Sequence, residues 1–124
     1  MSSCRIVVAD DSPDIRLLLK MALEREADFE LIGEAGNGAE AVSLADRLNP
    51  DLILLDLSMP VMDGLEAIPL IRDASPSTAI IVVSGFLNPE TKRRVLDAGA
   101  LGFVDKGGDF GQMIEYVRST WVGR

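Results

Sequence analysis

The chain contains no histidine, a single cysteine and few aromatic residues. Without histidine there can be no Ser-His-Asp or Cys-His catalysis, no histidine metal site and no phosphohistidine. Cys4 stands alone, which excludes an internal disulfide and a cysteine metal cluster. Any chemistry must therefore use carboxylates, hydroxyls, lysine and backbone groups.

Positive charge is also scarce, with 12 Lys and Arg against 20 Asp and Glu and a net charge of −8. This balance argues against direct contact with nucleic acid and against docking on an anionic membrane. No apolar run approaches the length of a membrane span, and the start, MSSCRIVVADDS, lacks the pattern of a signal peptide. We therefore expect a cytoplasmic location.

What the chain does have, over 124 residues, is 48% hydrophobic residues of which few are aromatic. This length suits one domain, and an aliphatic core suits a buried parallel sheet. Five aliphatic runs alternate with amphipathic helical patterns. The runs are Arg5–Ala9, Phe29–Glu34, Leu52–Leu55, Ile80–Val83 and Leu101–Val104. Strict alternation predicts parallel strands joined by right-handed crossovers, with helices on both faces.

Helix boundaries are marked by residues with known capping roles. Ser12 and Pro13 predict the start of the first helix, and Asn88-Pro89 predicts the start of the fourth. Gly99 is expected to end that fourth helix in a left-handed conformation. Pro69 lies inside the third helical pattern, where we expect it to kink the helix or to weaken one turn.

Polar residues follow four of the five predicted strands. They are Asp10-Asp11, Asp56, Ser84-Gly85 and Asp105-Lys106. Ligands of open parallel sheets bind beyond the carboxyl ends of the strands, so these groups should meet at one edge. Taken singly, each has an ordinary explanation as a cap, a turn or a solvated lysine. Those explanations would all have to hold together at four strand ends, which favours a functional site.

Three crowded carboxylates repel one another, so the site needs a cation or must keep a proton. Mg²⁺ suits such a site, because it binds through one or two carboxylates together with phosphate oxygens. A carboxylate could then attack phosphorus and become an acyl phosphate. Lys106 offers a charge to the phosphoryl oxygens, Ser84 a hydroxyl, and Gly85 a backbone N–H that can be approached closely.

These residues lie in strings that resemble the response-regulator receiver domains of bacterial two-component systems. The strings are IVVADDSPDIRLLL, GEAGNGAEAVSLADRLNPDLILLDLSMPVMDGLEAI, IIVVSG and AGALGFVDK. The resemblance implies that residues 1–124 form one receiver domain. It also implies a flavodoxin-like, doubly wound sheet of five parallel strands in the order 2-1-3-4-5 with five helices. A receiver is itself a known example of this strand order.

The resemblance also implies roles for matched residues. Asp56 would be phosphorylated, and Mg²⁺ would be held by Asp11, Asp56 and the Ser58 carbonyl, with Asp10 acting mainly through water. The phosphoryl oxygens would be held by four groups: Lys106, Ser84 and the backbone N–H groups of Ser58 and Gly85. Ser84 and Phe103 would form the switch that responds to phosphorylation.

The implied function is that of a phospho-acceptor switch, not an enzyme that turns over other substrates. Because the chain lacks histidine, the donor would be another protein, a sensor histidine kinase or phosphotransfer protein. The output would be a downstream partner, a fused DNA-binding domain or a phosphorylation-dependent dimer. The GEAGNG and MDG passages resemble the receivers of transcriptional regulators that carry a C-terminal helix-turn-helix domain. We expect no such domain within residues 1–124, and therefore either a free-standing receiver or one excised from a longer regulator.

The sequence departs from the family after Lys106, where Gly107-Gly108 replaces the usual proline that follows a cis bond. A cis bond before a residue other than proline costs about 3 kcal/mol, so we predict a trans bond. The expected output surface comprises the fourth helix, fifth strand and fifth helix, with apolar contacts from Phe86, Leu87, Phe103, Met113 and Tyr116. The alternative is that Phe103 is a static core residue.

Two other functions fit the residues less well. Gly36-Asn37-Gly38 opens a sequence that matches the dinucleotide-binding fingerprint. In dinucleotide-binding folds this fingerprint follows the first strand, but here it follows the second. A loop that caps the second helix explains these residues better. A phosphatase of the haloacid-dehalogenase type also phosphorylates an aspartate beside Mg²⁺. It would need an acid two residues after Asp56, where this chain has Ser58.

Overall fold

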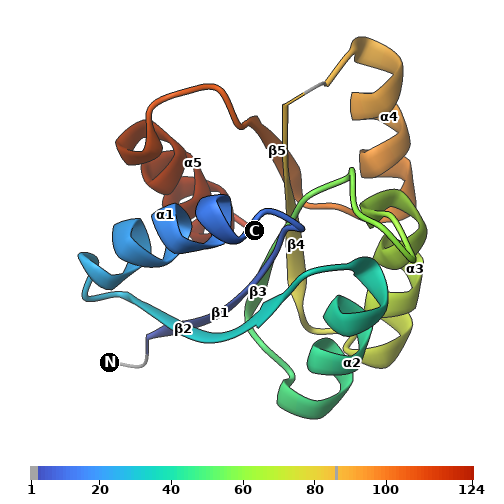
Figure 1. Cartoon of the computed structure of the whole chain (residues 1–124), viewed down its shortest axis with the longest axis horizontal. Helices are drawn as coiled ribbons and strands as arrows, with labels where there is room; N and C mark the ends of the chain where they lie inside the picture. The colour runs from blue at the N-terminus through green and yellow to red at the C-terminus, as the bar shows by residue number, and fades with distance from the viewer. Residues whose placement is uncertain (1–2, 86) are drawn as a thin grey trace.

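The computed structural model describes residues 3–85 and 87–124. Within them, five strands form one parallel sheet in the order β2-β1-β3-β4-β5 (Figure 1). The strands are β1 (Cys4–Ala9), β2 (Phe29–Ala35), β3 (Leu52–Leu55), β4 (Ala79–Ser84) and β5 (Gly102–Asp105). This confirms the predicted fold class and strand order.

Five helices in the described residues cover the two faces of this sheet. They are α1 (Pro13–Glu24), α2 (Gly38–Leu48), α3 (Gly64–Ala74), α4 (Pro89–Ala98) and α5 (Phe110–Val122). Helices α1 and α5 lie on one face, and α2, α3 and α4 lie on the other (Figure 1). Each strand therefore buries side chains on both faces, which explains why the strands are continuous aliphatic runs.

The predicted caps form as expected. The Ser12 side chain accepts the Ile15 N–H at the start of α1, and the Asn88 side chain accepts the Thr91 N–H at the start of α4. Gly99 ends α4 with φ of +119°, in the left-handed region that suits glycine. Helix α3 runs through Pro69 without interruption from Gly64 to Ala74.

Register along the sheet is regular except at its outer strand. Ile6 of β1 pairs with Leu31, but the next residue, Val7, pairs with Gly33. Ile32 is thus an extra residue in β2, which makes a β-bulge at the edge of the sheet. At the start of β1, Cys4 is buried, and this burial raises the pKa of its thiol to about 12, so that the thiol stays protonated at neutral pH.

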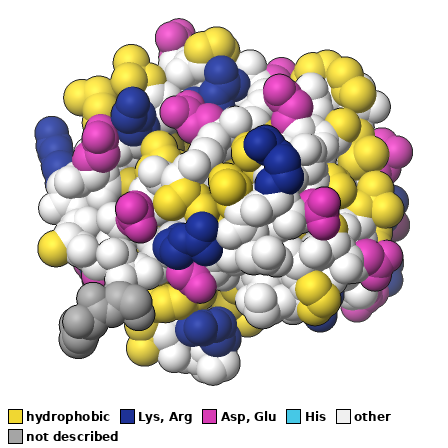
Figure 2. All heavy atoms as spheres, turned by 90° about the horizontal axis from the view of Figure 1, so that it is seen from below, with side chains coloured by type: hydrophobic (Ala, Val, Ile, Leu, Met, Phe, Trp, Pro, Cys, Tyr) yellow, Lys and Arg dark blue, Asp and Glu magenta, His cyan; other side chains and the backbone are white. Residues whose placement is uncertain are grey.

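Charges are mixed on the face seen in Figure 2. Acidic and basic side chains are interspersed with apolar ones over the part of this face that the structure describes. Such a surface differs from the continuous basic stripe of a nucleic-acid-binding domain.

Candidate functional site

Parallel strands deliver the predicted polar residues to one edge of the sheet. Asp10 and Asp11 follow β1, Asp56 follows β3, Ser84 ends β4 and Lys106 follows β5. There they surround a cavity of about 320 Å³. Its lining consists of Asp11, Asp56, Ser58, Ser84, Gly85 and Lys106. The predicted convergence of groups from four elements is therefore present.

The three acids of this edge lie close enough to share a ligand. Asp10, Asp11 and Asp56 each offer a carboxylate oxygen, and these oxygens lie within 4.8 Å of one another. Asp10 is 2% exposed and Asp56 4% exposed, whereas Asp11 faces solvent. Two of the negative charges are thus held out of water beside a third that is open to it.

Lys106 lies directly between the two buried acids. Its Nζ is 2.6 Å from Asp10 Oδ2 and 3.2 Å from Asp56 Oδ2. The resemblance assigned Lys106 only to the phosphoryl oxygens, but here its ammonium also pairs with both carboxylates. One lysine against three carboxylates leaves an excess of two negative charges at this edge.

This crowding changes the proton affinity of the site. Burial, followed by the charge of Asp10, raises the pKa of the Asp56 carboxyl above its ordinary value, and Lys106 offsets only part of that effect. Burial on its own lowers the pKa of Lys106. The hydrogen bond to Asp10 and the charge of Asp56 outweigh it and raise that pKa. Lys106 therefore stays charged, whereas ionisation of Asp56 in the folded protein is unfavourable compared with ionisation of an aspartate in water.

The loops after β1 and β3 fix the two buried acids. Asp10 Oδ1 accepts the Ser12 N–H at 2.9 Å, in the turn where Ser12 also caps α1. Asp56 Oδ1 accepts the Ser58 N–H at 3.4 Å. Each carboxylate thus keeps one oxygen on a backbone N–H and turns the other toward Lys106.

Gly64, at the start of α3, lies very close to the backbone of Asp56, and this explains why the residue is a glycine. A side chain at Gly64 would place its Cβ 2.1 Å from the Asp56 carbonyl oxygen, and the Gly64 N–H bonds to the Leu57 carbonyl at 2.9 Å. Asp63 caps α3 by accepting the Glu66 N–H at 2.8 Å. Only glycine lets α3 start this close to Asp56.

Strain is present in the loop between Asp56 and α3. The Met62 N–H bonds to the Pro60 carbonyl at 2.7 Å, across a γ-turn whose central residue, Val61, has φ of +67°. This conformation is unfavourable for a β-branched residue. The Val61 side chain is 84% exposed, so it has no burial to offset the strain and stands free beside the site.

The donor set fits Mg²⁺. The site supplies three carboxylates at short mutual distance, an uncompensated negative charge and an open side at Asp11. Hard oxygen ligands that leave positions open for water and phosphate oxygens are what Mg²⁺ prefers. Asp11 and Asp56 line the cavity together with Ser58, whose carbonyl was predicted to complete the set.

The two predicted switch residues are in different surroundings. Ser84 is buried at the end of β4, and its carbonyl accepts the Lys106 N–H at 3.0 Å. Phe103 is half-buried, and the Lys92 ammonium lies 5.4 Å from the centre of its ring. The Phe103 N–H donates to the Tyr116 hydroxyl at 3.1 Å, a link from β5 to α5 that the sequence did not reveal.

One expectation about the output surface is wrong. Met113 is 2% exposed and packs in the core beneath α1 and α5, so it cannot contact a partner. Met113 belongs to the core-facing side of α5 together with Ile114 and Val117. Leu87 is half-buried, and Phe86 lies outside the described residues.

The glycine-rich loop after β2 has a structural role. Asn37 caps α2 by accepting the Glu40 N–H, and the Gly38 N–H bonds to the Met62 carbonyl at 2.8 Å. A dinucleotide site would need that N–H for phosphate. The loop instead joins α2 to the segment that follows Asp56.

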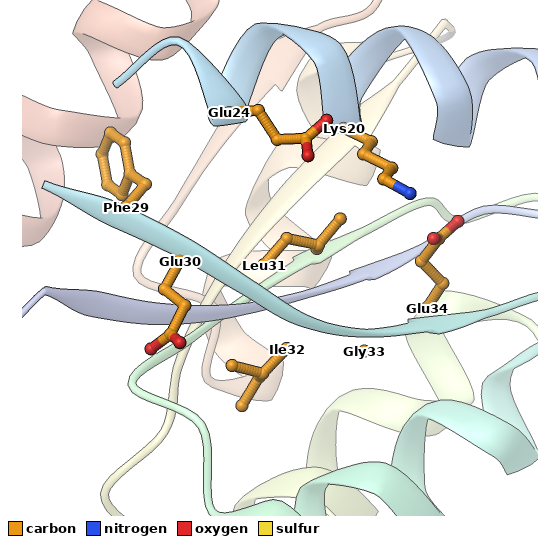
Figure 3. Close-up of a pocket in the computed structure, with 8 residues that line it drawn as sticks. All are labelled: Lys20, Glu24, Phe29, Glu30, Leu31, Ile32, Gly33 and Glu34. Atoms are coloured by element: carbon orange, nitrogen blue, oxygen red, sulfur yellow. The ribbon is translucent and has the colours of Figure 1, made fainter. Parts of the chain in front are cut away.

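A second cavity, of about 480 Å³, runs along the outer edge of β2 (Figure 3). Its charged side chains, Lys20, Glu24, Glu30 and Glu34, are spread along the strand and α1, and do not converge on one point (Figure 3). This cavity is larger than the one beside Asp56, but the clustered carboxylates, the lysine and the buried serine hydroxyl lie at the smaller cavity.

The chain has a doubly wound α/β fold with an acidic cluster at the carboxyl edge of its sheet, and the comparison of sequences identifies the family. The model of the response regulator receiver domain matches residues 6–118. The chain belongs to this family, as the resemblance indicated, and is a receiver domain of a two-component response regulator. Receiver domains are mostly signalling modules, not enzymes, and they bind Mg²⁺ in an acidic pocket.

Individual proteins with similar sequences support the same family assignment. The transcriptional regulatory protein LiaR of Bacillus subtilis is 37% identical over 119 residues, which are 96% of this chain and 56% of LiaR. A protein-glutamate methylesterase/protein-glutamine glutaminase of Caldanaerobacter subterraneus is 45% identical over 107 residues, 84% of this chain and 29% of that protein. This chain thus spans between about a third and just over half of the relatives' length.

Solved structures show the same fold. The signal receiver domain of the putative response regulator NarL from Mycobacterium tuberculosis has a TM-score of 0.93 and 31% identity over the whole of both chains. A CheX–CheY complex with BeF3 and Mg²⁺ from Borrelia burgdorferi contains a chain with a TM-score of 0.88 and 27% identity, covering 94% of this chain and 88% of that one.

Among the helices of residues 3–85 and 87–124, none combines the length and the apolar character needed to cross a membrane.

Proposed function

We propose that the chain, over residues 1–124, is a phospho-acceptor switch that receives a phosphoryl group on Asp56. The observation that supports this most strongly is the position of Asp56. It is buried at a strand end, with Asp10 and Asp11 oxygens within 4.8 Å and the Lys106 ammonium 3.2 Å away. Such a carboxylate has neighbours for both a metal ion and a phosphoryl group.

Each residue has a defined part in the transfer. An Asp56 carboxylate oxygen attacks the phosphorus of a phosphodonor; the new O–P bond makes an acyl phosphate, and the bond to the donor breaks with its electron pair leaving on the donor. Lys106 and the Ser84 hydroxyl would hold the phosphoryl oxygens, with the N–H groups of Ser58 and Gly85. Bound Mg²⁺, held by Asp11, Asp56 and the Ser58 carbonyl with Asp10 acting through water, would neutralise the acids and the incoming phosphoryl oxygens.

The donor in this proposal is a phosphohistidine on another protein, a sensor kinase or phosphotransfer protein. This chain would catalyse only its own phosphorylation and dephosphorylation. The relatives include transcriptional regulators and methylesterases, so the output is a downstream partner or a fused domain. A haloacid-dehalogenase-type phosphatase is disfavoured, because the position two residues after Asp56 holds Ser58.

Labelling tests the assignment. With acetyl phosphate and Mg²⁺, the protein should gain one phosphoryl group that hydroxylamine removes, seen as a mass increase that maps to Asp56. Asp56→Asn should gain none, and removal of the metal with EDTA should prevent the reaction. Asp63→Asn serves as the matched control, because it changes a capping aspartate of the same loop and should still be labelled. Full labelling of Asp56→Asn would overturn the proposal.

A further inference from the structure

Arg16, in the first turns of α1, reaches back over the end of β1. Its Nη1 donates to the Asp10 carbonyl oxygen at 2.6 Å, and its Nε lies 3.4 Å from Glu34 Oε1 on β2. The Arg16 side chain is 22% exposed, so most of it is held against the protein. In Figure 3, the Glu34 side chain lies on the side of β2 that faces α1. One guanidinium thus joins the edge strand to the loop that carries the acid pair.

The bond from Arg16 completes the set of partners around Asp10. The Asp10 N–H donates to the Ala35 carbonyl at 3.0 Å. The two carboxylate oxygens accept from the Ser12 N–H and pair with Lys106. With its carbonyl on Arg16, every polar group of Asp10 has a partner. Residue 10 is therefore fixed in orientation at backbone and side chain alike.

This bond also controls the next residue. The Asp10 carbonyl and the Asp11 N–H belong to one planar peptide group, so a donor that holds the carbonyl fixes the whole plane. Asp11 follows that plane and carries the solvent-facing carboxylate of the acid cluster. Rotation about the Cα–C bond of Asp10 would move the Asp11 Cα and its side chain relative to Asp56. The Asp10 carbonyl is thus a route by which Arg16 can influence Asp11 through the backbone.

We infer that Arg16 is a positioning residue for the cation site, which it serves by locking the Asp10–Asp11 peptide, and that Glu34 in turn holds the Arg16 guanidinium. This inference depends on the Mg²⁺ site proposed above. Residues that orient metal ligands typically change metal affinity by about 10- to 100-fold when they are mutated.

The alternative is that Arg16 and Glu34 form an ordinary surface ion pair, which contributes little. The direction in which removal of Arg16 changes the affinity for Mg²⁺ separates the positioning role from these alternatives. If Arg16 acted only as a nearby positive charge, its removal would strengthen cation binding by reducing repulsion. If it positions the peptide, its removal weakens binding, because Asp11 loses its fixed direction. A purely structural role would lower stability and leave the affinity for Mg²⁺ unchanged.

The experiment measures the Mg²⁺ dissociation constant of the folded protein by calorimetry and by titration of the Asp11 and Asp56 amide shifts. Arg16→Met should weaken binding by about tenfold. Arg16→Lys keeps the charge but lacks the planar fork that spans Asp10 and Glu34, so it should also weaken binding, by about threefold or more. In metal-free protein, the Asp11 amide signal should shift in both variants.

The matched control is Lys20→Met, which removes one positive charge from the next turn of α1. Lys20 points toward Glu34 in Figure 3, so its charge acts in the same region. Its substitution should leave Mg²⁺ affinity within about twofold of the wild type or raise it slightly. Glu34→Gln keeps Arg16 but weakens its support and should cost about two- to fivefold; it remains informative if Arg16→Met does not fold.

Tighter or unchanged Mg²⁺ binding in Arg16→Lys and Glu34→Gln, with a folded domain, would overturn the inference and leave the proposed function standing. A wild-type protein that binds no Mg²⁺ at millimolar concentration would instead overturn the proposed function itself. Weaker binding in the Arg16 and Glu34 variants, with Lys20→Met unaffected, supports the positioning role.

Discussion

At the scale of single residues, Asp56 is held in an environment that opposes its own charge. Burial and Asp10 raise the pKa of its carboxyl, so the folded protein binds a proton there more tightly than the unfolded chain does. Between the ordinary aspartate pKa of 3.8 and the raised value, lowering the pH therefore stabilises the metal-free fold. Above that window the stabilisation is lost, and the ionised site reduces the free energy of unfolding.

Asp56→Asn should remove this cost. We expect the metal-free variant to melt about 3–6 °C higher at pH 7, the shift that about 1 kcal/mol gives in a domain of this size. The stability of the metal-free variant should also fall less than that of the wild type as the pH rises from 3.8 to 7. Mg²⁺ at millimolar concentration should raise the melting temperature of the wild type at pH 7, because the ion binds only the folded site, and the variant should gain much less.

Asp28 sets the lower limit of the pH range in which these melting temperatures should be compared. The side-chain hydrogen bond from Arg118 lowers the pKa of Asp28, so its stabilising contribution is present above 3.8 and lost as the pH falls through the lowered value. Scanning calorimetry above pH 4.5 therefore avoids the pH range in which the contribution of Asp28 changes. Identical melting curves for wild type and Asp56→Asn, with and without metal, would contradict the repulsion inferred among the acids.

At the scale of elements, α3 contains a residue that works against its helix. Pro69 lies in the second turn, is exposed, and has no N–H to donate to the Leu65 carbonyl. Pro69→Ala should restore that hydrogen bond and stabilise the domain by about 1–2 kcal/mol, less than the full cost of about 3 kcal/mol for proline in a helix interior. Urea unfolding measures the difference.

Leu70→Ala is the matched control for Pro69→Ala. It changes the neighbouring partly exposed residue of the same turn without affecting the backbone, and should change stability by less than about 1 kcal/mol in either direction. If Pro69→Ala were neutral or destabilising, the ring would have to make contacts that outweigh the missing hydrogen bond.

The strands could be predicted from the sequence to within about one residue at most ends, because each is a short aliphatic run buried on both faces. The convergence of Asp10, Asp56 and Lys106 followed from topology alone, since parallel strands end at one edge. The caps at Ser12 and Asn88 followed from local hydrogen bonding, which short sequence windows contain.

Other features depend on packing and could not be found that way. The bulge at Ile32 is set by how β2 fits against β1 and the helices, and no local residue choice announces it. Met113 was wrongly placed at the surface, because helical spacing gives a stripe but not its width. Arg16 did offer a signal: one turn into a helix, a long side chain points back toward the preceding loop.

At the scale of the whole molecule, contacts connect the acid cluster to β5, the edge strand at the opposite end of the sheet from β2. The Lys106 N–H bonds to the Ser84 carbonyl, which ties the end of β5 to the end of β4. Further along β5, the Phe103 backbone is held by the Tyr116 hydroxyl and its ring lies near the Lys92 ammonium. A change at Ser84 can therefore reach α4 and α5 through β5.

Phosphorylation supplies acceptor oxygens that the Ser84 hydroxyl can bind. If Ser84 moves toward Asp56, it leaves space that the half-buried Phe103 ring can fill, and the ring then moves away from Lys92. An inward ring gains apolar burial and alters the surface of α4, β5 and α5. We expect phosphorylation to act in this way by shifting an equilibrium between two existing states, without creating a new one.

Beryllofluoride with Mg²⁺ tests this route by amide chemical shifts. We expect changes that spread from Asp56 through Ser84 to residues 103–116, and a downfield or upfield shift of the Phe103 amide as its bond to Tyr116 adjusts. Ser84→Ala should bind beryllofluoride but lose most of the distant changes, because the hydroxyl that responds to the ligand is absent. Ser119→Ala, an exposed serine of α5, should behave as the wild type. Changes confined to the loops around Asp10, Asp56 and Lys106 in the wild type would mean that Phe103 is a static core residue and that the signal leaves the site by another path.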